Sequence, residues 1–324
     1  MRPFLPLLGL VFALAVSCRQ NNPENIALPY AKKKNDACPA EKARFEHFLW
    51  LQNDSVFGEE IQHWLEHELE ASQAYLSALT WKSRNTRPQT DFASNPQIRH
   101  KVLPVCPIHT EDSAELHLYY RADLFGSGVK PLVMTFFDTV SDFSVPPVCF
   151  FEEGGILAVL RQIETSDSLD SLRLDSLPVR DTIDLERQLF GAMNVLISEG
   201  YTTPRKTAVI LRGKPMSLCQ KILFQRPDLF RAVYLEPVVS DSLHNEFWPD
   251  FTQAPDNPSY PSLLITNTPS HYYMVAYLQE LNRRQCGHTP VLLCEKPDYE
   301  TLWKFLLYPI TEKNRLVRRG KVGV

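Results

Sequence analysis

The chain has 324 residues, of which 44% are hydrophobic and 22% are charged, a composition typical of a globular protein with one sizeable core. Its 34 basic and 38 acidic residues give a formal net charge of -4, so no basic excess favours binding to nucleic acid. Length and composition therefore predict one domain, or one domain with a small extension.

The amino terminus has the pattern of an export signal. Arg2 precedes an apolar run from Phe4 to Val16, which is shorter than the roughly 20 residues needed to span a bilayer. The run ends in Ala15-Val16-Ser17-Cys18, which resembles a bacterial lipobox and implies cleavage before Cys18 and acylation of its thiol. We expect residues 1–17 to be a lipoprotein signal peptide, and the mature protein to be lipid-anchored in the bacterial cell envelope, facing the periplasm or the cell surface. An uncleaved anchor or an ordinary signal would also export the chain.

Several cysteines follow Cys18, and an exported compartment permits disulfides among them. They are Cys38, Cys106, Cys149, Cys219, Cys286 and Cys294. Their spacing fixes no pairing. Apolar neighbours around Cys149, Cys219 and Cys294 make buried thiols an equal alternative.

Residues 18–39 are polar and end in a lysine-rich stretch, which predicts a flexible tether. Residues 40–99 are predicted to form a helical extension and a linker, with helical periodicity in Ala40 to Trp50 and in Glu59 to Trp81. The second helix should bury one apolar face and present acidic residues on the other. That apolar face comprises Ile61, Trp64, Leu65, Leu69, Tyr75, Leu76 and Leu79.

The same helix contains an H-x-x-E-H string from His63 to His67, which is the inverted zinc-peptidase motif. Both histidines lie at i and i+4 on one helical face, a spacing that suits two zinc ligands. However, the sequence pattern indicates no second acidic residue that would complete a zinc site. We therefore interpret them as surface histidines of a structural helix and expect no metal, with zinc as the alternative.

Residues 100–324 alternate between predicted strands and helices, the pattern of a mostly parallel, doubly wound sheet. The predicted strands are Lys101 to Cys106, Glu115 to Tyr120, Pro131 to Phe137, Thr207 to Leu211, Ala232 to Val239, Pro261 to Thr266 and Val291 to Cys294. A helix is predicted from Thr182 to Glu199.

The stretch from Ile197 to Leu243 runs from a helix end through a turn, a strand, a sharp corner and a helix into a second strand. α/β-Hydrolases carry their nucleophile on such a corner. Ser198 to Thr202 reads SEGYT, and Gln225 to Val233 reads QRPDLFRAV. These strings and their spacing resemble the nucleophile region of the prolyl oligopeptidase family of serine peptidases. The resemblance implies an α/β-hydrolase fold with an N-terminal helical extension. That family's β-propeller has no counterpart here, and we expect it to be absent.

The residues that carry the family's chemistry are missing at the matching positions. Gly213 stands at the nucleophile position, in a corner that runs from Arg212 to Met216, and Pro215 fits the first position of the following helix. Phe136 stands where the resemblance places the tyrosine that helps hold the oxyanion. The two later loops supply neither the aspartate nor the histidine of the triad.

We therefore predict a catalytically inactive pseudo-peptidase that binds a peptide or a protein partner and needs no cofactor. The residues placed near the former cleft are Phe136, Gly213, Lys214, His271, Tyr272 and Tyr273. For the aromatic side chains, filling of the core is the equal alternative.

Two further functions stay open. A serine hydrolase of the prolyl oligopeptidase type would need a site rebuilt from Ser217, His271 and Asp298. An interaction subunit at the membrane surface is favoured if the helical extension exposes Trp50, Trp64 or Trp81.

Overall fold

A computed structural model of the chain describes residues 48, 50–51, 53–79, 86–88, 92, 94–105, 114–126, 128–136, 145–162, 179–215, 219, 222–223, 225–238, 260–269, 272–284 and 289–311. The predicted signal peptide, the predicted acylation site Cys18 and the predicted tether lie outside these residues.

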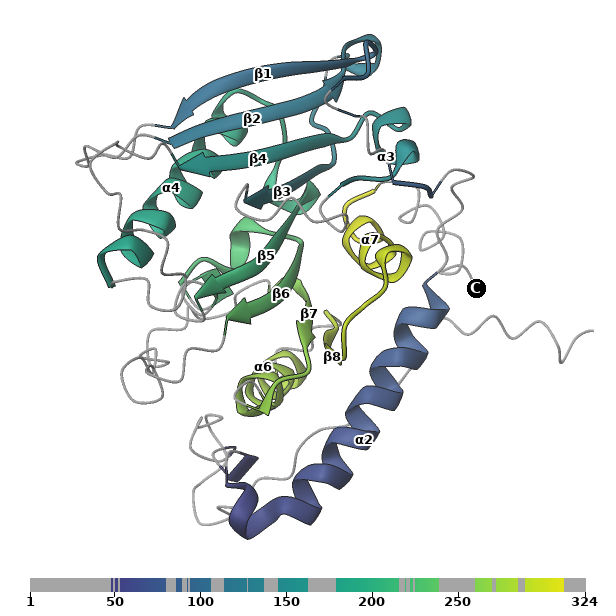
Figure 1. The fold of residues 1–324 in the computed structure, drawn as a ribbon, viewed down its shortest axis with the longest axis vertical. Helices are drawn as coiled ribbons and strands as arrows, with labels where there is room; N and C mark the ends of the chain where they lie inside the picture. Colours follow the sequence, from purple (N-terminus) through teal and green to yellow (C-terminus); the bar gives the residue numbers. More distant parts are fainter. Residues whose placement is uncertain are drawn as a thin grey trace, which may run out of the picture.

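An eight-stranded sheet runs through the centre of the molecule (Figure 1), with the strand order β1-β2-β4-β3-β5-β6-β7-β8. β2 pairs antiparallel with both of its neighbours, whereas every other pair is parallel. The strands are β1 (Ile98–Val105), β2 (Ala114–Arg121), β3 (Leu132–Phe136), β4 (Ile156–Gln162), β5 (Thr207–Pro215), β6 (Ala232–Val238), β7 (Ser262–Thr266) and β8 (Val291–Cys294). This mostly parallel order, with β3 between β4 and β5, is that of an α/β-hydrolase sheet, so the predicted fold class is confirmed.

Helices cover both faces of the sheet (Figure 1). They are α2 (Asp54–Ala78), α3 (Val148–Glu152), α4 (Val179–Ser198), α6 (Tyr272–Arg284) and α7 (Tyr299–Leu307). Because alternate strand residues point to opposite faces, Leu211 joins a hydrophobic cluster with α4 and α6. Its neighbour Ile210 joins a second cluster with α3 and α7. None of the described helices is both long and apolar enough to cross a membrane.

The strands match the sequence prediction closely, whereas the helical extension does not. β8 has the predicted bounds, and β1 to β3 differ from theirs by a few residues at the ends. The predicted second helix begins at Asp54 rather than Glu59 and ends at Ala78. Of the first predicted helix, only residues 48 and 50 are described, and these have 3-10 rather than α-helical geometry.

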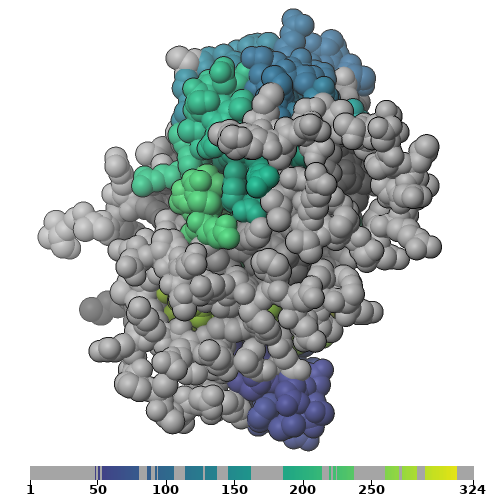
Figure 2. Space-filling view, turned by 90° about the vertical axis from the view of Figure 1, so that its left-hand side faces the viewer, coloured from purple at the N-terminus to yellow at the C-terminus, as the bar shows by residue number. Residues whose placement is uncertain are grey.

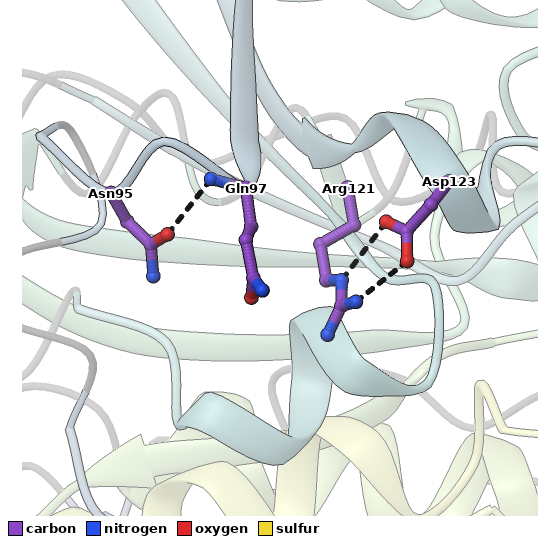
Figure 3. A network of polar contacts seen from close by, with 4 residues as sticks. All are labelled: Asn95, Gln97, Arg121 and Asp123. Carbon is purple, nitrogen blue, oxygen red and sulfur yellow. Dashed lines mark hydrogen bonds and ion pairs between the residues drawn. The ribbon is translucent and has the colours of Figure 1, made fainter.

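Local polar contacts hold the two strand ends that lie together at one corner of the sheet (Figure 3). The Asn95 side chain accepts a hydrogen bond from the Gln97 N–H at 2.9 Å, just before β1 begins. At the end of β2, the guanidinium of Arg121 donates two hydrogen bonds, of 3.1 and 2.6 Å, to the Asp123 carboxylate. These contacts fix the turns that lead into and out of the β1–β2 pair.

α2 covers β8, which is one edge of the sheet. The Ser72 hydroxyl accepts a hydrogen bond from the Leu293 N–H at 3.1 Å. The Gln279 amide of α6 donates to the Val291 carbonyl at 3.1 Å. Backbone groups of an edge strand have no strand partner on one side, and here side chains from two helices supply those partners.

The predicted division of α2 into an apolar and an acidic face is wrong at Glu68, which is fully buried. Its Oε1 accepts a hydrogen bond from the Gln279 Nε2 at 2.6 Å. Burial raises the pKa of Glu68 to about 8, although the hydrogen bond from Gln279 opposes the rise. The side of α2 that packs against the sheet edge meets polar as well as apolar groups. Glu68 can be buried there because the Gln279 amide supplies a polar partner.

Candidate functional site

The carboxyl edge of the sheet is the candidate functional site, because ligands of open α/β sheets bind beyond the carboxyl ends of the strands. Six parallel strands end there, at Phe136, Gln162, Pro215, Val238, Thr266 and Cys294. The side chains of these strand ends and of the residues that follow them decide what the edge can do.

Gly213, at the predicted nucleophile position, lies near the end of β5. It has a φ of +64° and is exposed, and a Cβ placed on it would meet no atom within 4 Å. A positive φ is the conformation that a strained corner requires and that glycine adopts without cost. The position thus presents bare backbone where the resemblance implies a side chain with a hydroxyl.

The strand continues past Gly213, which corrects the predicted corner. Arg212 pairs with Glu236 and Pro215 pairs with Val238, so β5 holds one more residue than β6 between these pairs. An extra residue with positive φ forms a bulge that lets the ladder resume. Pro215 is therefore the last residue of a strand and not the first residue of a helix.

A polar cluster lies beside Gly213 at the ends of β5 and β6. The Arg212 Nε is 2.9 Å from the Glu236 Oε2, and the Tyr234 hydroxyl donates to the same oxygen at 2.9 Å. Burial, followed by the charge of Glu236, raises the pKa of Tyr234 well above its usual value. The phenol therefore stays protonated and serves as a donor to the carboxylate.

Cys294, at the end of β8, is a candidate nucleophile that interacts electrostatically with Glu236 and Tyr234 of this cluster. Burial, with smaller contributions from Glu236 and Glu295, raises the pKa of its thiol to about 12. Its Sγ lies 3.5 Å from the Ile265 carbonyl, to which the thiol donates. A thiol with so high a pKa is not the reactive thiolate at neutral pH.

Two other cysteines agree with the interpretation as buried thiols. These are Cys149 and Cys219. Cys38, Cys106 and Cys286 lie outside the described residues.

The aromatic residues predicted near the former cleft are buried. Phe136, Tyr272 and Tyr273 expose 5%, 4% and 7% of their surface and belong to the core cluster on the α6 side of the sheet. The Tyr272 hydroxyl donates to the Asn267 Oδ1 at 2.8 Å. This placement favours core filling over ligand contact. Lys214 is part of β5, and His271 lies outside the described residues.

Of the three residues considered for a rebuilt hydrolase site, the structure describes only Asp298. Its side chain accepts a hydrogen bond from the Thr301 N–H at 2.7 Å and caps α7. A cap uses the carboxylate for helix stability. Ser217 and His271 lie outside the described residues, so the rebuilt site stays a hypothesis.

The two histidines and Glu66 of the H-x-x-E-H string lie on the solvent side of α2. His63 and His67 are both exposed, with ring centroids 4.6 Å apart. Within the described ranges, no group of three or more His, Cys, Asp or Glu side chains is placed to hold a metal ion. Trp50 and Trp64 are buried, so neither offers the exposed indole that a membrane-surface subunit was expected to show, and Trp81 lies outside the described residues.

Sequence reasoning missed a histidine pair on the sheet surface. The His100 Nε2 of β1 is 3.0 Å from the His117 Nδ1 of β2, and the His117 Nε2 is 3.1 Å from the Glu115 Oε2. Burial, and then the neighbouring His117, lowers the pKa of His100. The alternation of polar and apolar residues in β2 predicts that Glu115 and His117 share a face, but only the register of the sheet brings His100 to them.

Comparisons with known proteins found likenesses only among solved structures. No family model and no curated protein matches the chain. A prolyl endopeptidase is 16% identical with a TM-score of 0.49, and the match covers 67% of this chain and 39% of that one. A post-proline cleaving enzyme from Rickettsia typhi is 14% identical with a TM-score of 0.48, covering 66% of this chain and 38% of that one. Oligopeptidase B from Leishmania major is 18% identical with a TM-score of 0.47, and the match covers 69% of this chain and 38% of that one. The chain thus spans less than two fifths of these peptidases, and its fold follows from the strand order given above.

Proposed function

We propose that this protein is a non-catalytic α/β-hydrolase-fold protein, a pseudo-peptidase similar to prolyl oligopeptidases, that binds a peptide or protein partner at the carboxyl edge of its sheet. The observation that carries the proposal is Gly213, which is exposed, has a φ of +64° and has no side chain at the nucleophile position. An α/β-hydrolase cannot form its acyl-enzyme without a nucleophile at this place.

The neighbouring groups support the loss of catalysis. The thiol of Cys294 has a pKa of about 12, and the carboxylate of Asp298 caps α7. On β3, which is the neighbour of β5 in the sheet, the phenyl ring of Phe136 cannot donate a hydrogen bond to an oxyanion. Losing one member of a catalytic triad already lowers the rate by orders of magnitude, so losing several leaves no acyl transfer of this kind.

The same edge keeps features that suit binding. Gly213 has no Cβ. A ligand backbone can therefore approach the end of β5 more closely than it could if position 213 carried a side chain. The ion pair of Arg212 and Glu236 lies next to it and brings a cation and a carboxylate to the edge. An extended peptide presents N–H and C=O groups that match such a mixed polar site.

A titration with labelled proline-containing peptides tests the binding proposal on the full chain in detergent. We expect saturable binding that a Gly213→Leu variant weakens by about tenfold or more, equivalent to about 1.4 kcal/mol. The Leu side chain would occupy the open space beyond Gly213.

Gly200 provides a matched control, because it is also exposed, has a φ of +74° and has open space around it. It lies before β5 begins, next to Tyr201, whose carbonyl accepts the Lys130 N–H at the amino edge of the sheet. A Gly200→Leu variant carries the same backbone strain and should bind normally. Absence of saturable binding, or equal loss in both variants, would count against the carboxyl edge as the binding site.

We further propose that acylation of Cys18 anchors the protein in the bacterial cell envelope, on the strength of the sequence that precedes this cysteine. A Cys18→Ala variant should appear in the soluble fraction of cells that retain the unchanged protein in the membrane fraction. Equal membrane retention of both proteins would contradict lipid anchoring.

A further inference from the structure

The solvent face of α2 carries two histidines one helical turn apart. His63 and His67 are exposed, with ring centroids 4.6 Å apart and ring planes inclined at 59°. Residues at i and i+4 of a helix are neighbours on its surface, and inclined rings allow one nitrogen of each to point toward a common centre. The spacing therefore places the two imidazole rings side by side on the solvent face of the helix.

The backbone beneath this pair is held in place. The opposite side of α2 buries Ile61, Trp64 and Glu68, which lie before, between and after the two histidines in sequence. The one departure from helical geometry within α2 is at Phe57, before the pair begins. Two donors on a docked, regular helix lose little freedom when they bind the same ion, which favours binding.

The charge on α2 favours a cation. Between Asp54 and Ala78 the helix has six acidic residues and neither lysine nor arginine. The acidic residues are Asp54, Glu59, Glu60, Glu66, Glu68 and Glu70. All except Glu68 are exposed, so they lower the electrostatic potential around His63 and His67.

The other histidine pair is occupied by contacts of its own. The facing nitrogens of His100 and His117 are 3.0 Å apart, which is the length of a hydrogen bond, and the remaining His117 nitrogen contacts Glu115. Among the described residues, no hydrogen bond or ion pair involves His63 or His67. The donors of α2 can thus take up an ion without breaking an existing contact.

We propose that His63 and His67 form a two-histidine chelate for a divalent transition-metal ion, whose remaining positions are filled by water. Imidazole nitrogen binds Cu²⁺, Ni²⁺ and Zn²⁺, whereas Mg²⁺ and Ca²⁺ take oxygen ligands. A site with two protein ligands is open and exchangeable, unlike a closed structural zinc site with four. It is a binding site distinct from the carboxyl edge and does not depend on the function proposed for that edge.

Titration with Ni²⁺ alone tests the site on the full chain, purified in detergent without a polyhistidine tag. Ni²⁺ is chosen because it does not oxidise thiols as Cu²⁺ does. At about pH 7.5 we expect saturable binding by calorimetry and a rise in melting temperature, because an ion that binds only the folded chain stabilises it. Mg²⁺ should do neither. At about pH 5.5 the Ni²⁺ affinity should fall by about tenfold or more, because protons compete with the ion for its nitrogen ligands.

Two variants locate the site. A His67→Ala variant should lose about tenfold or more in Ni²⁺ affinity, because a single imidazole remains. A His100→Ala variant, which alters the occupied pair, should bind Ni²⁺ as the unchanged chain does. His67 is exposed and makes no described hydrogen bond, so its removal should leave the metal-free melting temperature nearly unchanged. Unaltered Ni²⁺ affinity in His67→Ala, or an equal loss in His100→Ala, would overturn the proposal.

Discussion

Replacing Glu68 by glutamine should remove a large pH dependence of stability. Glu68 is fully buried, and burial raises its pKa from 4.5 to about 8. Its Oε2 and the Oε1 of Gln279 have no hydrogen-bond partner among the described residues. A proton on the carboxyl group supplies the donor that these two acceptors lack, so the folded protein keeps Glu68 neutral at pH values where the unfolded chain ionises it.

The direction of the effect follows from proton counting. Between about pH 4.5 and about pH 8 the folded state holds a proton that the unfolded state has lost, so the free energy of unfolding falls as pH rises. The slope is about 1.4 kcal/mol per pH unit, which amounts to about 3 kcal/mol between about pH 5 and about pH 7. The contribution of Glu68 is most favourable below its unfolded pKa and is lost as the pH rises toward 8.

The assay is denaturant unfolding of the unchanged chain and of Glu68→Gln at several pH values. Glutamine cannot ionise, and its amide can donate to Gln279. The variant should therefore gain about 3 kcal/mol relative to the unchanged chain between about pH 5 and about pH 7. A Glu70→Gln variant changes an exposed carboxylate on the same helix and should keep the slope of the unchanged chain. Parallel pH profiles for Glu68→Gln and the unchanged chain would show that Glu68 does not cause the pH dependence of stability.

Three further substitutions test individual contacts. Ser72→Ala leaves the buried N–H of Leu293 without its acceptor and should lower the free energy of unfolding by about 1–3 kcal/mol. The amide of Leu293 should then exchange faster. An unchanged exchange rate would show that Ser72 does not protect this edge. Asp298→Ala removes the cap of α7 and should cost about 1 kcal/mol, which Asp298→Asn should largely restore; equal stability of all three chains would argue against the cap. Gly213→Ala should cost about 1–2 kcal/mol in chemical denaturation, because the positive φ strains an L residue even in open space, and a stabilising effect would contradict that backbone geometry.

Much of the sheet follows from local sequence signals. The β8 run Val291 to Cys294 is apolar and bounded by turn residues, and the structure places a strand at those bounds. Gly213 was expected in a corner after a strand that ends at Leu211, and it has the positive φ that glycine permits, although β5 continues past it. In both cases the information is contained within a few neighbouring residues.

The errors concern residues whose environment comes from far along the chain. Glu68 reads as part of an acidic solvent face, but its partner Gln279 lies 211 residues away. Pro215 reads as the start of a helix because proline suits that position, yet pairing with Val238 extends β5 through it. Periodicity measures the local pattern and cannot show which side of a helix meets a sheet edge, or where a bulge lets a strand continue.

Some features of the candidate site could be predicted from the sequence, and others depend on how distant parts of the chain pack together. The absence of a nucleophile at Gly213 is visible in the sequence, because it depends on residue type alone. Burial of Tyr272 and Tyr273 depends on how α6 packs against the sheet, and sequence reasoning left it open between core filling and ligand contact. The ion pair of Arg212 and Glu236 needs the β5–β6 register, which no local pattern determines.

Reaction of the full chain with a fluorophosphonate, followed by intact-mass measurement, tests whether the protein has an activated serine. Such reagents modify serines that an adjacent base has activated. We expect an unmodified mass for a protein whose cooperative melt shows that it is folded. A stoichiometric adduct would contradict it, and mapping that adduct would show whether Ser217 or another serine serves as the nucleophile.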